Sequence, residues 1–149
     1  MEFSGDELAG VVDLFGALTR EELRRALAEL AFRAGEEADP ADFEAGVEAA
    51  VESFALVEHD GLLAAGPAAF PTLPAGAPDL PHMLDIEERS VDREALARTV
   101  EEQLAAAAEA AADAGDAERA AALREVTYDA EAWGPVGVEA VRETLSEDE

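Results

Sequence analysis

The sequence predicts a mostly α-helical protein with a single β-hairpin. Apolar residues recur at helical spacing in three stretches before residue 54 and in three more after residue 92. Between them, residues 54–70 carry two short apolar runs around an Asp-Gly pair, and residues 71–85 hold four prolines. We therefore expect a three-helix N-terminal part with one β-hairpin, a Pro-rich connector, and a C-terminal helical hairpin followed by a short helix.

Each of the three N-terminal helices has a start signal. Residues 4–7 (SGDE) and residues 19–22 (TREE) are capping boxes, in which Ser or Thr and a later Glu satisfy backbone N–H groups. Asp39 and Pro40 give the third helix its N-cap and first residue, and Gly35 ends the second helix. The apolar stripes that predict a shared core are Leu8, Val11, Val12, Phe15 and Leu18 on the first helix, Leu23, Leu27 and Leu30 on the second, and Phe43, Val47, Ala50, Val51 and Phe54 on the third.

The stretch FALVEHDGLLAAGPAAF, residues 54–70, predicts the hairpin. Its strands contain residues 56–57 and 62–63, and residues 59–61 (HDG) form the turn, because glycine tolerates a positive φ. Residues 66–67 (GP) end the second strand. Two strands alone are only marginally stable, so we expect the hairpin to pack against the helices.

The connector covers residues 71–85, PTLPAGAPDLPHMLD. Its prolines and glycine predict an extended chain without helix. Its larger apolar residues predict that it packs along the body of the protein; these are Leu73, Leu80, Met83 and Leu84.

The C-terminal part, residues 86–149, is predicted to be helical. Asp92 caps a helix that Gly115 ends, and Asp116 caps its antiparallel partner. Residues 133–135 (WGP) break the chain before a last short helix, whose apolar residues are Val138, Val141 and Leu145. The chain then closes on the acidic run 147–149. We expect three parts, residues 1–70, 71–85 and 86–149, with the last packed on the first as one body.

The composition is strongly acidic, with 36 Asp and Glu, 10 basic residues that are all Arg, and a net charge of −26. The acids alternate with apolar residues at helical spacing, which argues against a disordered acidic tail. Two interpretations remain, a mimic of nucleic acid and a hydrated surface suited to molar salt, and we favour the second. At 1 M salt the screening length is about 3 Å. We therefore predict that the protein loses stability at low salt.

Recognisable catalytic and metal-binding motifs are missing from the sequence. It has no cysteine, no Gly-rich phosphate loop, no nucleophile elbow and no zinc-protease motif. His59 lies at the hairpin turn and His82 in the connector, without the spacing of a metal site. We expect no catalytic residue, no cofactor and no metal. The absence of a long apolar run and of a basic leader predicts a cytoplasmic protein without membrane contact.

Two resemblances extend this interpretation. Residues 4–70 resemble a winged-helix domain, on the stripe Phe43-Val47-Val51-Phe54, the strand Leu56-Val57 and the turn Asp60-Gly61. The whole chain is similar to a small haloarchaeal family of unknown function, on the segments LAGVVDLFGALTREEL, DLPHMLDIEERSVDRE and AWGPV. The second resemblance implies no activity.

The third helix of a DNA-binding winged helix enters the major groove. The resemblance therefore implies that residues of the third helix here would read the DNA. Reading bases and phosphates requires hydrogen-bond donors and cations. The polar face of this third helix instead carries four carboxylates, which are Asp42, Glu44, Glu48 and Glu52. The wing tip, residues 58–60 (EHD), is not basic either. The sequence therefore argues against binding of nucleic acid.

Five residues are candidates for contact with a partner, namely Arg20, Arg24, Arg25, Tyr128 and Trp133. The arginines, together with Arg33, could bind phosphate or an acidic partner. The alternative, which we favour, is internal neutralisation by pairs of Glu21 with Arg24 and Arg25, and of Glu22 with Arg25. The two aromatic residues are expected to pack the C-terminal helices, with partner anchoring as the alternative.

We draw three functional hypotheses from the sequence. The first is a non-catalytic adaptor that binds or regulates an unidentified protein. The second is a winged-helix transcription regulator that binds DNA as a dimer through the arginines of the second helix. The third and weakest is an enzyme or ligand carrier without a recognisable motif. A homodimer is compatible with all three.

Overall fold

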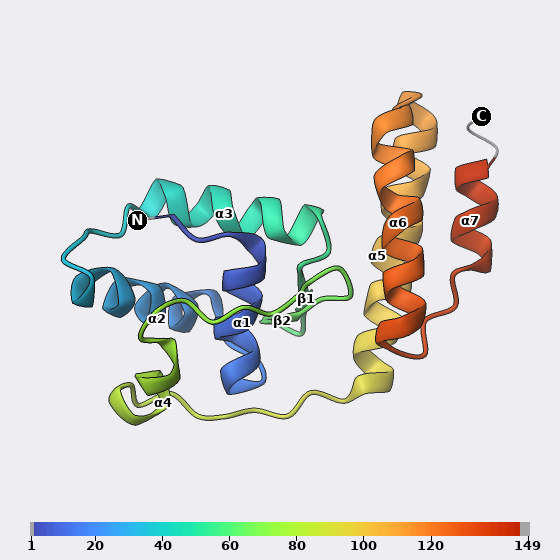
Figure 1. Ribbon diagram of the computed structural model, residues 1–149. Helices are drawn as coiled ribbons and strands as arrows, with labels where there is room; N and C mark the ends of the chain where they lie inside the picture. Colours follow the sequence, from blue (N-terminus) through green and yellow to red (C-terminus); the bar gives the residue numbers. More distant parts are fainter. Residues whose placement is uncertain (1, 147–149) are drawn as a thin grey trace. The chain divides into compact units, whose positions relative to one another are not determined.

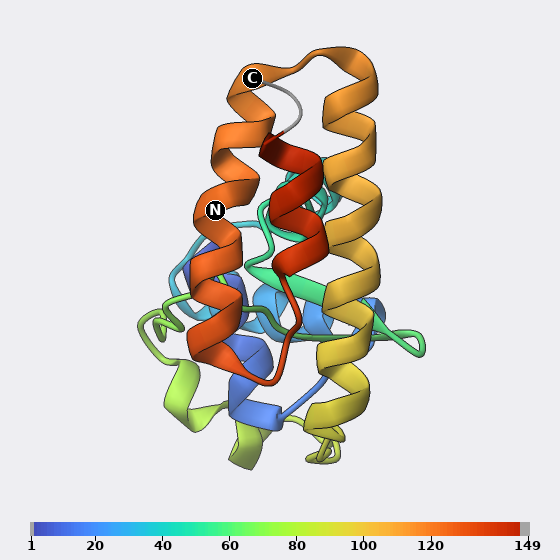
Figure 2. The same ribbon diagram turned by 90° about the vertical axis from the view of Figure 1, so that its right-hand side faces the viewer.

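The computed structural model describes residues 2–146 and divides between Val91 and Asp92 into two compact units (Figures 1 and 2). We describe each unit by itself. Helices dominate both, and a single two-stranded antiparallel hairpin completes the described fold, which confirms the predicted fold class. The acidic run 147–149 lies outside the described residues.

The first unit begins with the three predicted helices, α1 (Gly5–Phe15), α2 (Arg20–Arg33) and α3 (Pro40–Glu52). Both capping boxes form, and Asp39 caps α3 by accepting a hydrogen bond from the backbone N–H of Ala41 at 2.8 Å. Their apolar faces meet in one core, whose largest fully buried helical side chains are Val11, Val12, Phe15, Leu23 and Leu30. The predicted caps therefore form, and the predicted stripes lie against this core, except that Leu18 and Phe54 fall outside their helices.

The hairpin consists of β1 (Leu56–His59) and β2 (Leu62–Ala65), paired from Leu56 opposite Ala65 to His59 opposite Leu62. Asp60 and Gly61 both adopt positive φ, 52° and 78°, as a two-residue hairpin turn of type I′ requires. The strands pack on α1 and α3, as expected for a hairpin too small to be stable alone.

Leu18 lies outside the helix to which its spacing assigned it. Helix α1 ends at Phe15, and Leu18 extends the hairpin as an isolated bridge with Leu63. Leu18 N–H donates to the carbonyl oxygen of Leu63 at 3.0 Å, and Leu63 N–H donates back at 2.7 Å. The side chain is still fully buried, so apolar spacing predicted its burial but not its backbone conformation.

Phe54 also lies outside its predicted helix. Helix α3 ends at Glu52, and Phe54 follows with a φ of 64°, a left-handed conformation unusual for an aromatic residue. Phe54 N–H donates to Val51 O, and Ala55 N–H donates to Ala50 O, which is the Schellman pattern of a helix end. Burial of the ring keeps Phe54 at a position where glycine is usual.

The expectation of a connector without helix was wrong. A 3-10 turn, η1 (Ala77–Asp79), and a one-turn helix, α4 (Leu80–Met83), lie within residues 71–85. Both begin with a proline in the first turn, where the missing N–H costs no hydrogen bond. Ala77 and Leu80 are buried in the core, whereas Leu73 and Met83 stay 46% and 47% exposed, so the connector packs with only part of its apolar residues.

Residues 66–91 run along the first unit in contact with α1 (Figure 1). Thr72 N–H donates to Asp6 O at 3.0 Å, and Arg89 N–H donates to Phe15 O at 2.8 Å. Gly10 permits the first approach, because a Cβ there would lie 2.1 Å from the carbonyl oxygen of Thr72. The backbone of this segment is therefore fixed to both ends of α1.

The second unit consists of three helices that pack pairwise, α5 (Arg93–Ala114), α6 (Ala117–Trp133) and α7 (Glu139–Ser146), as Figure 2 shows. Gly115, with a φ of 64°, makes the tight turn from α5 to α6 that the sequence predicts. The larger buried side chains of the unit are Leu96, Val100, Leu104, Leu123, Val126, Val136, Val138, Val141 and Leu145. Across residues 2–146, no helix combines the length and the apolar character needed to cross a membrane.

Candidate functional site

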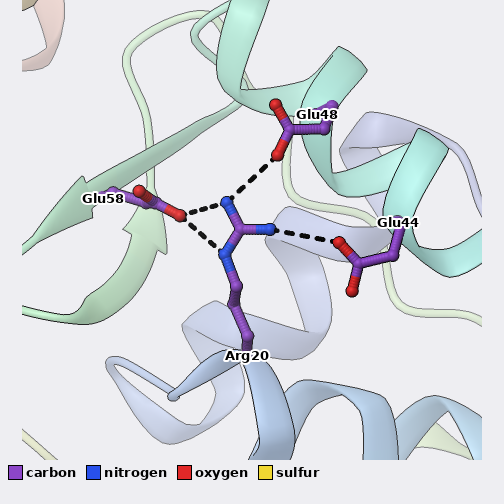
Figure 3. Close-up of polar contacts among 4 residues, drawn as sticks. All are labelled: Arg20, Glu44, Glu48 and Glu58. Carbon is purple, nitrogen blue, oxygen red and sulfur yellow. Dashed lines mark hydrogen bonds and ion pairs between the residues drawn. The ribbon is translucent and has the colours of Figure 1, made fainter.

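Arg20, the first arginine of the predicted cluster, is surrounded by three carboxylates of the first unit (Figure 3). Its Nε donates to Glu58 Oε1 at 2.7 Å, and Nη2 also contacts that oxygen. Nη2 lies 3.3 Å from Glu48 Oε1, and Nη1 lies 3.6 Å from Glu44 Oε2. One side chain at the start of α2 thus links α3 and β1.

The three carboxylates of the same unit neutralise the positive charge of Arg20. The hydrogen bond from Arg20 to Glu58 raises the pKa of the guanidinium above its usual value, and the charges of Glu58 and Glu48 raise it further. One positive and three negative charges meet there, so the group as a whole remains anionic. An anionic surface of this kind repels phosphate.

The other arginines of α2 differ in their surroundings. Arg24 forms the expected pair with Glu21, which raises the pKa of Arg24 through a hydrogen bond. Arg33, at the end of the helix, lies 3.7 Å from Asp79 Oδ2 and contacts the sulfur of Met83 at 3.1 Å. Arg25 is exposed, and the hydrogen bond from Arg24, together with the charges of Arg24 and Arg25, lowers the pKa of Glu21. The expected pairing of Glu21 with Arg24 therefore forms, and the charge of Arg25 also acts on Glu21.

The expected pair of Glu22 with Arg25 does not form. Glu22 binds Arg89 instead, through Nη1–Oε1 at 2.5 Å and Nη2–Oε2 at 3.1 Å. Two parallel bonds to a planar guanidinium are stronger than a single exposed helical pair. Because Arg89 is far from Glu22 in the sequence, local spacing could not identify it as the partner of Glu22.

The two aromatic candidates lie in the second unit, and each is covered by an arginine. The guanidinium carbon of Arg142 lies 4.5 Å from the ring centroid of Tyr128, and that of Arg93 lies 4.7 Å from the centroid of Trp133. Tyr128 is 63% exposed, whereas Trp133 is half-buried. These cation–π contacts order both rings, and the tyrosine ring still presents area to solvent.

Neither histidine is part of a metal-binding group within the described residues. His59 Nε2 lies 3.4 Å from Asp60 Oδ2 at the hairpin turn, and His82 is exposed on α4. No three His, Asp or Glu side chains between residues 2 and 146 come together in a way that could hold a metal ion.

The first unit has a groove between α2 and α3 that the sequence did not reveal. Two adjoining depressions share Leu27, Ala38, Asp39 and Phe43, and have empty volumes of about 320 and 310 Å³, including space open to solvent. The lining residues that belong to one depression only are Glu2, Phe3, Leu8, Asp42 and Gly46 for the first, and Arg24, Ala28 and Pro40 for the second. We call this surface the α2–α3 groove.

Phe32, on α2, is a large apolar side chain that is left in solvent, with 78% of its area exposed. It follows Ala28, a lining residue, by one helical turn on the same side of α2. A signal was available in the sequence: Phe32 falls off the stripe of Leu23, Leu27 and Leu30, so its helix places an aromatic ring on the polar face.

Comparison with known proteins gives a family but no function. No curated protein and no solved structure matches the chain. Residues 6–149 match a family of unknown function (DUF7109), which spans both units. The chain therefore belongs to the DUF7109 family.

Proposed function

We propose that this protein is a non-catalytic adaptor that binds, and thereby regulates, another protein. One observation carries the proposal: the first unit pairs Arg20 and Arg24 with its own carboxylates, yet leaves Phe32 in solvent, one helical turn along α2 from a residue that lines an apolar groove. Large exposed apolar side chains at a concave surface are typical of protein interaction sites.

A pull-down tests the adaptor function. The tagged full chain is incubated with lysate in about 2 M KCl, a salt concentration that screens non-specific attraction to its acidic surface. We expect a defined partner to be retained in stoichiometric amount. Retention of no partner by the full chain would contradict the adaptor function.

We further propose that the protein works in a cytoplasm of high salt. The net charge of −26 and the absence of Lys support this environment. Many carboxylates are exposed in the first unit, among them Glu36, Glu37, Asp42, Glu44 and Glu48. At low salt, their mutual repulsion opposes the compact state.

DNA binding is the second candidate. The order of three helices and a hairpin over residues 4–70 favours it through its likeness to a winged helix. The ion pairs of Arg20 weigh against it, because a cation already held by three carboxylates is not available to phosphate. A filter-binding assay with genomic DNA in about 2 M KCl tests this candidate. Retention of DNA there, weakened by Arg25→Gln, would favour DNA binding over the adaptor function.

A further inference from the structure

We propose that the α2–α3 groove binds the apolar face of a short amphipathic helix from another protein, and that this helix carries Arg or Lys beside its apolar residues. The proposal rests on the adaptor function and adds the chemistry of the partner. It follows from the walls of the groove, from the position of Phe32 and from the charges at the rim.

The groove has an apolar floor between two helices. Leu27 of α2 is buried, and Phe43 of α3 is partly buried against the same core. Gly46 lies about one turn after Phe43 and has no side chain to fill the space, with the nearest side-chain atom 3.8 Å from where a Cβ would be. The floor can therefore accept an apolar side chain from outside.

Phe32 lines neither depression itself, but it lies on α2 one helical turn beyond the residues that do. Arg24 and Ala28 line the groove and are four residues apart, so the next residue in this series along the helix is Phe32. An exposed ring at the end of such a wall can bury its area only against a partner. Burial of an aromatic side chain of this kind dominates many interface energies.

The rim of the groove is anionic. Glu2, Asp39 and Asp42 line it, and Arg24, the one cation among the described lining residues, is already paired with Glu21. Asp42 has no hydrogen-bond or ion-pair partner within residues 2–146. Carboxylates at the edge of an apolar surface favour a partner that carries Arg or Lys there.

These charges also decide between a second copy of this chain and a different protein. In a symmetric dimer, the same surface faces itself, so Asp42 and its neighbours would meet like charges on a chain of net charge −26. A basic segment meets no such repulsion. A helix is the expected shape, because both walls are helices and a third helix can lay its ridge between them.

A selection experiment tests the chemistry of the partner. Phage that display random helical peptides are selected on the immobilised full chain in about 0.5 M KCl, which leaves short-range ion pairs in place. We expect enriched peptides to combine apolar residues at i, i+3 and i+4 with Arg or Lys on the flanks. Enrichment of acidic or neutral peptides, or of none, would overturn the proposal.

A binding titration tests the location. Phe70 is the matched control, because it is 77% exposed, also aromatic and also in the first unit, but lies outside α2, whereas Phe32 lies on α2 one turn after the lining residue Ala28. For the enriched peptide, we expect Phe32→Ser to weaken binding about tenfold or more, and Phe70→Ser to change it less than about twofold. Equal effects of the two substitutions would overturn the groove as the site.

A third experiment tests the negative charge at the rim of the groove and has its own control variant. Asp42→Asn is compared with Asp13→Asn, which removes an exposed carboxylate of α1 that does not line the groove. We expect only the first to weaken binding, by about threefold to tenfold at low salt and less at high salt. Circular dichroism of each variant confirms that it is folded.

The two proposals fail in different ways. If the pull-down retains a partner whose binding is unchanged by Phe32→Ser, the adaptor function stands and the groove proposal fails. If the full chain retains no partner, the adaptor function itself fails. A second copy of the chain as the bound species, detected as a dimer by light scattering that Phe32→Ser abolishes, would replace the basic helix as the occupant.

Discussion

Arg89 and Glu22, which are 67 residues apart, form a two-bond ion pair that joins the segment after α4 to the first turn of α2. Arg89 Nη1 also donates to Ala17 O at 3.1 Å, and Glu22 Oε1 also accepts the backbone N–H of Thr19 at 2.9 Å. One carboxylate thus caps a helix and anchors a distant segment. Both side chains are partly buried, so solvent screens the pair in part.

We predict that Glu22→Gln destabilises the first unit by about 1–3 kcal/mol. Glutamine keeps the capping box but removes the charge that binds Arg89. Glu7→Gln is the control, because Glu7 has the same capping role in α1 and no arginine partner among the described residues. Urea unfolding measures both free energies, and equal losses for the two variants would contradict a special role for Arg89.

The same pair predicts a dependence on pH. The hydrogen bond from Arg89 lowers the pKa of Glu22 in the folded protein, and the bonds from Thr19 act in the same direction. The unfolded carboxyl therefore binds a proton at higher pH than the folded one. The stabilisation is complete above the unfolded pKa and is lost as pH falls through the folded pKa. We expect a shallower acid loss of stability for Glu22→Gln than for the wild type, measured by urea midpoints across the acidic range.

Gly10 provides a third prediction, one that opposes helix propensity. Alanine is the better helix former by about 1 kcal/mol, yet a Cβ at position 10 would meet the backbone of Thr72. We expect Gly10→Ala to destabilise the protein by roughly 1–3 kcal/mol, because that backbone must move. Gly46→Ala, in α3, is the control and should be neutral or stabilising, since its Cβ would have only ordinary contacts. A stabilised Gly10→Ala variant would show that the backbone at Thr72 does not pack closely against α1.

Arg20 provides a fourth prediction. Its removal leaves Glu44, Glu48 and Glu58 close together without their common cation. The side chain is partly exposed, so solvent reduces the effect, and we expect Arg20→Gln to cost about 1 kcal/mol, and more at low salt. Arg24→Gln breaks the exposed pair with Glu21 and is the control. Thermal melts at low and high KCl that show no difference between the two variants would refute the role of Arg20.

Salt should stabilise the whole protein. We predict that the melting temperature rises between about 0.1 and 2 M KCl, because salt screens the repulsion among carboxylates. The check is a thermal melt followed by circular dichroism at several KCl concentrations, with sucrose series as a control for non-ionic stabilisation. An unchanged melting temperature would contradict the proposed adaptation to high salt.

Local signals in the sequence were sufficient for most of the helices and for the hairpin. Caps at Ser4, Thr19 and Asp92, and the turn at Asp60-Gly61, act through hydrogen bonds and backbone preferences of residues a few positions apart. The family match extends along both units but adds no function. Proline content misled the prediction for residues 71–85, because proline breaks a helix interior but not its first turn.

The sequence by itself determined the acidic surface, the helix starts and the apolar faces, since these depend on residue type and on short-range spacing. Only the tertiary structure decided that Arg20 faces Glu58 and that Arg89 rather than Arg25 binds Glu22. Each of these depends on which distant segment comes to lie beside the side chain. That choice is made by the packing of the whole core and by the close backbone approaches that glycine permits, and no local pattern encodes it.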